Sequence, residues 1–393
     1  MNKVSAASGS PRYYLELVGK TLDVIGVLGH HEGELRLSEI AEASHIDNAT
    51  VFRILYTMEK RGYVLRNQQT KKFRLALGYH RYRVGYAQLC TEEPFVRAVT
   101  QGLIDEANKL QMDLLVVDNR ADADQALKNA EWLIEQKVDF VIEYQIHYRV
   151  APVLADMFAK ACIPTLAIDI PQPHAVYFGA DNYTAGRLGG EALGSFAHHK
   201  WRGQVDRLLL LEAPMAGRTP QSRIIGTIQG VRNLLPHLST RCIMHRGVKE
   251  THTVEGGYRA ATKVLQSLSP RTRLLIASVN DCCALGALRA VREAGHERRA
   301  AIMGQNFSPD PLIETEIRKN DSPLIGSVAY FPERYGSKIV PLALKWLNKE
   351  QIPPAVHTDH VLVTRENVDE FCAERDLASN RANGPSSVPD GPT

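Results

Sequence analysis

The segment that most constrains the fold of this chain is residues 35–76, where helical and hairpin patterns follow one another closely. Apolar residues recur at helical spacing twice, first at Leu37, Ile40 and Ala41 and then at Val51, Ile54, Leu55 and Met58. After Gly62, two alternating runs at 63–66 and 73–76 flank a polar tip, which predicts a β-hairpin. Short helix, tight turn, longer helix and hairpin, in this order, predict a winged helix-turn-helix.

Polar residues at the expected helix starts support this interpretation. Ser38 is placed to cap the first helix, and either Asp47 or Asn48 is placed to cap the second. The connection between the two helices is short, at residues 44–46, as a helix-turn-helix requires.

The charge of this segment indicates a double-stranded DNA partner. Residues 48–83 contain nine Lys and Arg and one acid, Glu59, whereas residues 1–47 contain four Lys and Arg and seven acids. Clustered cations bind a phosphate backbone by releasing its counterions. A solvated basic face on an ordinary helical domain is the alternative, and the order of the helices argues against it.

At these residues, LSEIAEASHIDNATVFRILYTMEKRGYVLR followed by KKFRLA resembles the DNA-binding domain of IclR-type bacterial regulators. The resemblance implies that residues 48–60 form the recognition helix and that the hairpin is a wing. His45 stands where a glycine is usual in the turn. The residues expected to contact DNA are Ser38, Asn48, Ala49, Thr50 and Arg53 from the helices and Arg66, Lys71, Lys72 and Arg74 from the wing.

The remaining three quarters of the chain belong to a different class. Segments that read as strands alternate with segments of helical period, for example 165–168 before 184–197 and 274–277 before 283–294. Such alternation predicts parallel, doubly wound sheets with helices on both faces. About 300 residues exceed one comfortable core, so two lobes with a cleft between them are expected.

Polar and aromatic residues follow the ends of these strands, where open α/β sheets bind ligands. The candidates are Phe95, Glu93, Glu143, Asp169, Arg223, Asn280, Asn306 and Tyr330. Charged and amide groups around a flat ring suit a polyol, whose hydroxyls and C–H face they contact. For any single residue, loop capping or a salt bridge between the lobes is the simpler role, and it is their number at matching positions that favours a ligand site.

Residues 82–371 resemble the periplasmic-binding-protein-like domain of LacI-type regulators and ribose-binding proteins, through IPTLAIDI, FGADNYTAGRLGGEAL, SRIIGTIQGV, ASVNDCCALGALRAVREAG, IMGQNFSPD and LIGSVAYFPERYG. The resemblance implies ligand contact by Asp169, Arg223 and Asn280. Asn306 takes a place usually held by Asp, and Tyr330 one often held by Gln, so the effector class extends to sugar derivatives and other small polar metabolites. Structural roles are implied for Asp181, Asn182, Gly186 and a strand at 356–364.

Other features limit the location and chemistry of the protein. The chain has no apolar run of membrane-spanning length and no secretion signal, and its six cysteines lack paired spacing, which predicts a cytoplasmic protein. No nucleophile-elbow, zinc-protease or phosphate-loop motif occurs, and no metal or cofactor is expected. Cys282 and Cys283, near a predicted helix start, leave a thiol sensor as a minor alternative.

We therefore expect an α/β chain with a winged helix-turn-helix at 1–76, a linker at 77–82, a two-lobed periplasmic-binding-protein-like domain at 83–375 and a disordered tail at 376–393. The predicted function is a homodimeric transcription regulator that binds a DNA operator under control of a small, sugar-like effector. One alternative is a cytoplasmic sugar sensor without operator binding. Another is an enzyme that uses Glu93, Glu143 and Asp169 in the interlobe cleft.

Overall fold

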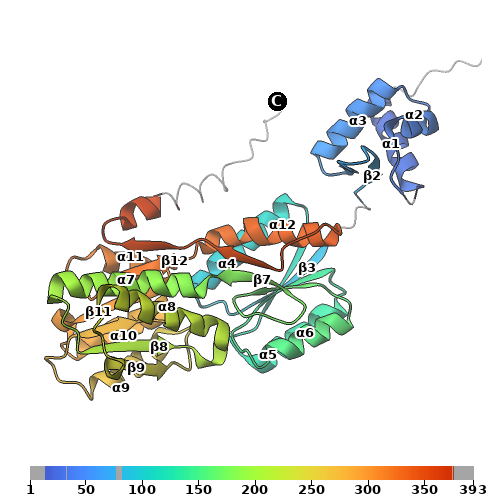
Figure 1. The fold of residues 1–393 in the computed structure, drawn as a ribbon. Coiled ribbons are helices and arrows are strands. Elements are labelled where there is room, and N and C mark those ends of the chain that lie inside the picture. Colours follow the sequence, from blue (N-terminus) through green and yellow to red (C-terminus); the bar gives the residue numbers. More distant parts are fainter. Residues whose placement is uncertain (1–13, 32, 77–81, 374, 376–393) are drawn as a thin grey trace, which may run out of the picture. The chain divides into compact units, whose positions relative to one another are not determined.

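The computed structural model describes residues 14–31, 33–76, 82–373 and 375. The chain divides into two compact units, Met1–Arg81 and Tyr82–Thr393 (Figure 1). The predicted linker, apart from Tyr82, and the predicted disordered tail at 376–393 lie outside the described residues.

The first unit contains the predicted helices and hairpin. Its elements are α1 (Glu16–Gly29), α2 (Leu37–Ser44), α3 (Asn48–Lys60), β1 (Val64–Arg66) and β2 (Phe73–Leu75). The hairpin pairs Val64 with Leu75, and a further bridge joins Leu35 to Phe73. The apolar positions that recur in α2 and α3 are buried together with Val24, Leu28 and Phe73, except for Leu37, which is partly buried against them. The sequence-based order of elements is therefore confirmed.

The helix caps differ from the prediction at one end. α2 begins at Leu37, so Ser38 lies inside the first turn, and its predicted role as the cap is wrong. The Arg36 backbone N–H instead donates to Glu39 Oε2 at 2.6 Å. Asp47 caps α3 as predicted, because its Oδ1 accepts from the Thr50 N–H at 2.9 Å. His45 has a φ of 53°, the left-handed conformation that a glycine adopts most easily.

The first lobe of the second unit is a six-stranded sheet in the order β13-β7-β6-β5-β3-β4. Its strands are β3 (Arg83–Gln88), β4 (Asp113–Asp118), β5 (Phe140–Tyr144), β6 (Thr165–Ile168), β7 (Val176–Ala180) and β13 (Ala355–Thr358). Helices α4 (Pro94–Lys109) and α12 (Tyr335–Leu347) cover one face, and α5 (Ala123–Glu135) and α6 (Ala151–Lys160) cover the other. All the pairings in this sheet are parallel.

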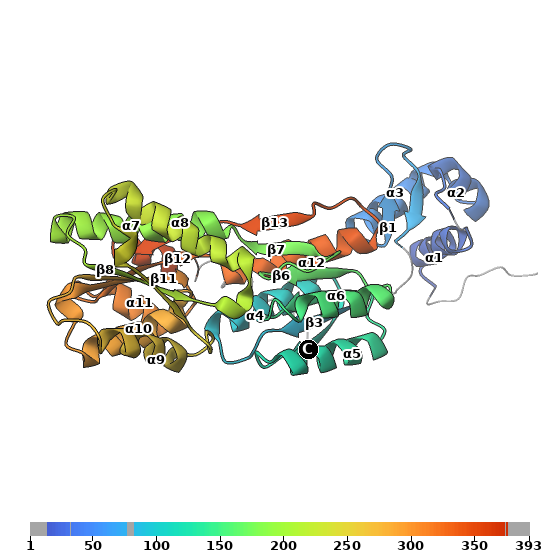
Figure 2. The same ribbon diagram turned by 60° about the horizontal axis from the view of Figure 1, so that its bottom comes forward.

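The second lobe repeats this architecture in the order β14-β12-β11-β10-β8-β9. Its strands are β8 (Arg207–Glu212), β9 (Ile243–Gly247), β10 (Leu274–Ala277), β11 (Ala300–Asn306), β12 (Leu324–Ala329) and β14 (Val361–Thr364). Helices α7 (Asn182–Trp201) and α8 (Arg218–Leu234) cover one face, and α9 (Val254–Leu265), α10 (Asp281–Glu293) and α11 (Pro311–Arg318) the other. Figures 1 and 2 show the two lobes side by side.

The sequence patterns located most strands but not all elements. They missed the edge strand β9, whose residues are half-buried or exposed. The strand expected at 356–364 is two strands, β13 in one lobe and β14 in the other, and the chain passes between the lobes at 359–360. β14 runs antiparallel to β12, so the expectation of purely parallel sheets is wrong at this edge.

Close packing of α7 against α8 depends on glycine. A Cβ added to Gly190 would lie 2.2 Å from the Thr227 carbonyl oxygen on α8, and one added to Gly186 would lie 1.9 Å from the Arg223 carbonyl oxygen. Neither helix can move away without uncovering the core of the second lobe, to which α7 and α8 both contribute. The same close approach positions Arg223.

We predict that Gly190→Ala destabilises the second unit by about 1–3 kcal/mol, because the added methyl group overpacks the helix crossing. Chemical or thermal unfolding of the full chain would measure the loss. Gly26→Ala on α1 is the matched control, since nothing lies within 4 Å of the position that its methyl group would take. There alanine should be neutral or stabilise by about 0.5–1 kcal/mol. Equal effects of both substitutions would contradict the packing argument.

Candidate functional site

The exposed side of α3 is the candidate DNA-contacting surface of the first unit. Asn48, Ala49 and Arg53 are exposed, and Thr50 is half-buried, with its backbone N–H held by the Asp47 cap. Sequence reasoning missed two exposed aromatic residues on the same helix, Phe52 and Tyr56, whose rings stack with centroids 6.3 Å apart. Phe52 and Tyr56 fall outside the helical spacing of the buried positions of α3, and this was the signal that could have identified them as exposed. Aromatic and apolar side chains on a groove-facing helix can contact thymine methyl groups.

The wing is held in shape by an acidic residue that precedes α2. The Asn67 side-chain amide donates to both oxygens of Glu34, at 3.1 and 3.0 Å, and Thr70 Oγ1 donates to Glu34 Oε2 at 3.1 Å. Lys71 is exposed at the tip, at a φ of 58°. Of the other predicted wing contacts, Lys72, Arg74 and Arg66 are half-buried, and the Arg66 guanidinium lies over the Phe73 ring.

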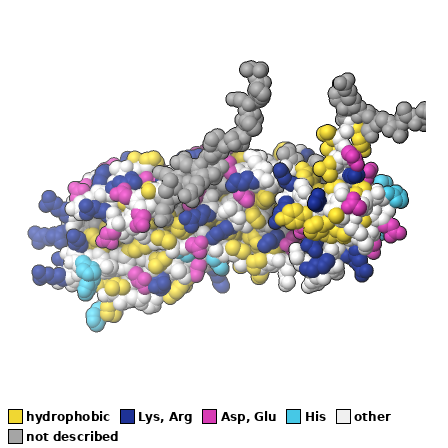
Figure 3. Space-filling view, turned by 90° about the horizontal axis from the view of Figure 1, so that it is seen from above, with side chains coloured by type: hydrophobic (Ala, Val, Ile, Leu, Met, Phe, Trp, Pro, Cys, Tyr) yellow, Lys and Arg dark blue, Asp and Glu magenta, His cyan; other side chains and the backbone are white. Residues whose placement is uncertain are grey.

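Basic side chains also gather outside the first unit. Figure 3 shows Lys and Arg at the left-hand end of the second lobe. The segments before β10 and β11 at that lobe carry Arg271, Arg273, Arg298 and Arg299. Positive charge alone therefore does not locate a DNA-binding surface, and the helix-turn-helix geometry has to be added to it.

Arg223 lies at the centre of the candidate ligand site between the lobes. Its Nε and Nη2 donate to Asn182 Oδ1 at 3.0 and 2.7 Å, and its Nη1 donates to the Val279 carbonyl at 2.6 Å. The guanidinium lies over the Tyr330 ring, 5.3 Å from its centroid. Asn182 thus orients Arg223. A structural role was predicted for Asn182, and this contact is one way in which it can have that role.

Two predicted residues meet across the lobes. Asn280 follows β10 in the second lobe, and Glu93 precedes α4 in the first. Asn280 Nδ2 donates to Glu93 Oε1 at 3.5 Å and, more closely, to the Thr251 carbonyl at 2.7 Å. Asn280 Oδ1 caps α10 by accepting from the Cys283 N–H at 3.0 Å. The amide of Asn280 is therefore already engaged within the protein.

Asp169, which follows β6, and Asn306, the last residue of β11, have an unusual backbone conformation. Their φ angles are 61° and 92°, in the left-handed region that Asp and Asn tolerate better than most residues. Burial raises the pKa of Asp169, while the charge of Arg223 and hydrogen bonds from the Tyr144 side chain and the Ala180 backbone oppose the rise. Because the charge of Arg223 acts on Asp169, Asp169 belongs to the group of side chains around Arg223.

Tyr330 contributes its ring to this group. Its hydroxyl donates to Gln305 Oε1 at 2.7 Å, and its carbonyl accepts from Thr358 Oγ1 at 2.7 Å. Phe95 packs edge-on against Tyr330 and Tyr335, and its side chain is buried in the first lobe. Phe95 therefore contacts the Tyr330 ring from within the core of the first lobe and supports it there.

Glu143 is not joined to this group by any hydrogen bond that the structure records. It is buried on the opposite face of β5 from Tyr144, because successive residues of a strand point to opposite faces. Asn119 Nδ2 donates to Glu143 Oε1 at 3.2 Å, and Glu143 Oε2 has no partner among the described residues. Burial raises the pKa of Glu143 to about 8, and the Asn119 hydrogen bond opposes the rise.

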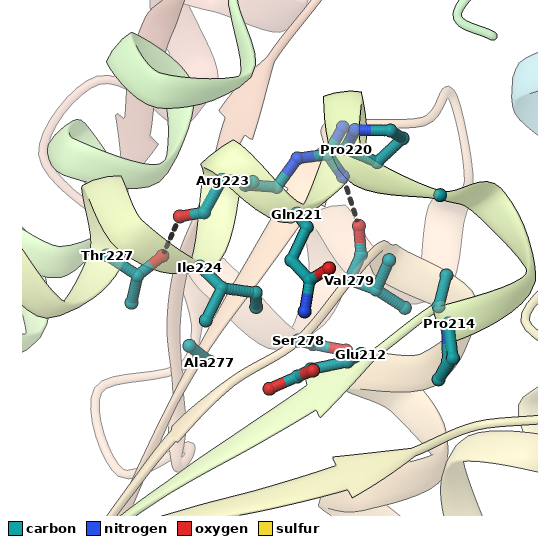
Figure 4. Close-up of a pocket in the computed structure, with 12 residues that line it drawn as sticks. Glu212, Pro214, Pro220, Gln221, Arg223, Ile224, Thr227, Ala277, Ser278 and Val279 are labelled. Atoms are coloured by element: carbon teal, nitrogen blue, oxygen red, sulfur yellow. Dashed lines mark hydrogen bonds between the residues drawn. The ribbon is translucent and has the colours of Figure 1, made fainter.

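A small pocket lies in the second lobe beside Arg223 (Figure 4). It is bounded by the end of β8, the start of α8 and the end of β10, with Glu212, Gln221, Arg223, Thr227 and Ser278 among its lining residues. Its cavity volume is about 30 Å³, enough for roughly one water molecule. Arg223 is the one predicted ligand residue in its lining, so this pocket is not by itself the predicted effector site.

Thiol and metal chemistry receive little support. Burial raises the pKa of both the Cys282 and Cys283 thiols, and the charge of Glu93 adds to the rise, which is the opposite of what a reactive thiol needs. Within the described residues, no group of three or more His, Cys, Asp or Glu is arranged to hold a metal ion. None of the helices in the described part of the chain is both long and apolar enough to cross a membrane.

We predict that Glu143→Gln stabilises the protein at pH 8.5 but not at pH 4.5. A carboxyl whose folded pKa is raised contributes its full stability below the unfolded pKa, and that contribution is lost as pH rises through the folded value, here about 8. The amide cannot ionise, so the variant should gain on the order of 3 kcal/mol over wild type at the higher pH. Unfolding at both pH values checks this, with exposed Glu131→Gln as control. A difference that does not change with pH would refute the assignment.

Comparison with known proteins agrees with this architecture. Residues 84–351 match the periplasmic binding protein domain family, and residues 17–68 match the IclR helix-turn-helix domain. The ribose import binding protein RbsB of Salmonella typhimurium is 24% identical over 280 residues, which cover 70% of this chain and 87% of that protein.

Two solved structures illustrate the shared fold. The periplasmic solute binding protein of Actinobacillus succinogenes with bound D-allose has a TM-score of 0.62 and 20% identity, and the match covers 73% of this chain and 99% of that one. The solute binding protein of Bacillus halodurans with bound myo-inositol has a TM-score of 0.63 and 18% identity, with 76% and 100% covered. The chain thus belongs to the periplasmic binding protein domain family and carries an IclR-type helix-turn-helix domain ahead of it.

Proposed function

We propose that this protein is a transcription regulator whose binding to a DNA operator is controlled by a small polar effector, a sugar or sugar derivative, held between the two lobes. The observation that carries the proposal is the union of an IclR-type helix-turn-helix and a periplasmic binding protein domain in one chain. The helix-turn-helix alone gives no reason for the periplasmic binding protein domain, and that domain alone gives no reason for the helix-turn-helix. A DNA-binding unit joined to a ligand-binding unit is the minimum that ligand-responsive regulation needs.

The first unit supports the DNA-binding half of the proposal. The Asp47 cap leaves the start of α3 exposed together with Asn48, Ala49 and Arg53, and Lys71 projects at the wing tip. A helix N-terminus and clustered cations both favour phosphate. The remaining predicted contacts are Ser38, in the first turn of α2, and the half-buried Thr50, Arg66, Lys72 and Arg74.

The second unit supports the effector half. Arg223, Asp169, Tyr330, Asn280 and Glu93 come from both lobes and converge where the strands end. Related solved structures carry D-allose and myo-inositol as bound ligands. An effector in this position stabilises one lobe arrangement, and the DNA-binding equilibrium shifts with it. A two-fold operator would be matched by a homodimer in the cytoplasm.

An enzyme in the interlobe cleft is less well supported. That function requires Glu93, Glu143 and Asp169 to work together. Glu143 instead bonds to Asn119 on the other face of β5. The families that match are binding-protein and regulator domains. Ligand binding without turnover separates the two functions.

The DNA-binding half is tested at the wing. Lys71→Ala should weaken binding about equally on all duplex sequences and should flatten the salt dependence of log K by ~1, because one phosphate contact is lost. Fluorescence anisotropy across a salt series measures both quantities. Lys249→Ala, an exposed lysine of the second unit, is the control and should leave the slope unchanged. An unchanged slope for Lys71→Ala would remove the wing from the contact surface.

The effector half is tested at Asp169. Asp169→Asn should abolish the rise in melting temperature that an effector gives to the wild type, because a ligand bound only to the native state stabilises it by mass action. DNA affinity without effector should stay nearly the same. Asp156→Asn on the exposed side of α6 is the control. A normal effector response in Asp169→Asn would show that the ligand binds elsewhere.

A further inference from the structure

The polar groups of the interlobe site differ in how much hydrogen-bonding capacity they have left. Most of the donors are engaged inside the protein. Arg223 donates hydrogen bonds to Asn182 and Val279. Asn280 donates to Thr251, and the Tyr330 hydroxyl donates to Gln305. The recorded hydrogen bonds leave two N–H groups of Arg223 and the Tyr335 hydroxyl as donors for a ligand.

Glu93 is the acceptor with the most capacity to spare. Its side chain is only 4% exposed, yet among the described residues its carboxylate accepts one hydrogen bond, from Asn280 at 3.5 Å, the limit for such a bond. Oε2 accepts none that the structure records. Glu93 also precedes α4 without capping it. A buried carboxylate in this condition is costly unless a partner satisfies it.

The neighbours of Glu93 increase this cost. Its charge interacts unfavourably with Asp281 and Asp169, and burial together with these charges raises the pKa of Glu93 to about 8. Other titratable groups that interact with it are the Tyr144 hydroxyl and the thiols of Cys90, Cys282 and Cys283. None of these is a cation.

The other two carboxylates are better satisfied than Glu93. Asp281 accepts from Ser327 Oγ at 2.7 Å and from the Ser308 N–H at 2.6 Å. Asp169 faces the charge of Arg223. A second group without a partner lies nearby, since the fully buried Tyr335 hydroxyl bonds to no described residue and interacts with the charge of Asp169. Glu93 is therefore the carboxylate of this site for which no cationic neighbour is recorded, since the charge of Arg223 acts on Asp169.

We propose that the effector carries a protonated amine that pairs with Glu93, so that its class is an amino sugar or amino polyol and not a neutral sugar. This inference rests on the proposed function, because it names the effector class of the same site. The ring and hydroxyls of such a ligand would meet Tyr330, Arg223 and Asp169. The ammonium supplies the charge-assisted hydrogen bonds that Glu93 lacks.

Binding of matched compounds to the full-length protein tests the proposal. Each set has an amine, the hydroxyl compound and the N-acetyl compound on one ring: glucosamine, glucose and N-acetylglucosamine, and the corresponding galactose and mannose sets. Calorimetry at pH 6 should show an amine that binds about tenfold or more tightly than its hydroxyl counterpart, because the attraction between a buried ammonium and the ionised Glu93 exceeds the cost of removing the Glu93 proton. The N-acetyl compound should bind no better than the hydroxyl compound.

Glu93→Gln should remove the preference for the amine, whereas Glu92→Gln should keep it, since Glu92 is the exposed neighbour on the same loop. Binding of the amine at pH 6 should also release about one proton, because Glu93 gives up its proton when it pairs with the ammonium. Calorimetry in two buffers of different ionisation enthalpy measures this release. It should disappear in Glu93→Gln even if that variant binds weakly.

The outcomes separate the two proposals. If a neutral sugar binds the wild type as tightly as its amine, or the amine binds without proton release, the inference about Glu93 is overturned and the sugar-class effector stands. If no compound of any set binds, the sugar-class effector is overturned and the inference falls with it.

Discussion

The ligand-binding unit depends on the hydrogen bonds of Arg223. Through Asn182 this side chain fixes the start of α7, and through the Val279 carbonyl it fixes the end of β10. Its guanidinium also covers Tyr330, which follows β12. Asn182 and Tyr330 lie beside points where the chain passes between the lobes, at β7 to α7 and at β12 to α12. The close crossing of α7 and α8 at Gly186 and Gly190 sets the backbone from which Arg223 reaches them. Packing and site geometry are thus parts of one arrangement.

The same hydrogen bonds decide what the site offers a ligand. Arg223, Asn280 and Tyr330 are residue types that commonly donate to sugar hydroxyls, but here each already donates to a protein acceptor. What remains is two N–H groups and the face of the Arg223 guanidinium, the Tyr330 ring and carboxylates. Residue identity at a matching position therefore does not establish a contact. The hydrogen-bond partners determine whether a side chain is available.

The sequence predicted the parts of the fold that follow from periodicity. The recurrence of Val51, Ile54, Leu55 and Met58 located α3, and the apolar run 165–168 located β6 to the residue. Asp169, Arg223 and Asn280 were expected together because the carboxyl ends of parallel strands share an edge.

Other details depend on information that periodicity does not carry. Glu143 and Tyr144 are adjacent in a fully buried strand, so no alternation in the sequence shows which of them faces the site. The cap of α2 was misplaced because Ser38 suits a cap chemically, while the actual cap position, Arg36, lies two residues earlier. The exposed Phe52 and Tyr56 were hidden by the assumption that aromatic residues of a helix lie inside. Tertiary contacts determine which side chain faces the site, where a helix begins and which aromatic residues are exposed.

Buried acidic groups also relate effector binding to lobe movement. With the lobes in contact, Glu93 is buried, and burial together with the charges of Asp281 and Asp169 opposes its ionisation. An arrangement with the lobes apart would hydrate Glu93 and reduce the repulsion. A cation bound between the lobes would reverse the balance, because its attraction to the carboxylates exists only when the lobes meet. A ligand shifts an equilibrium only by its difference in affinity for the two states. For the cationic effector proposed above, Glu93 would supply that difference, because it has no cationic partner within the protein.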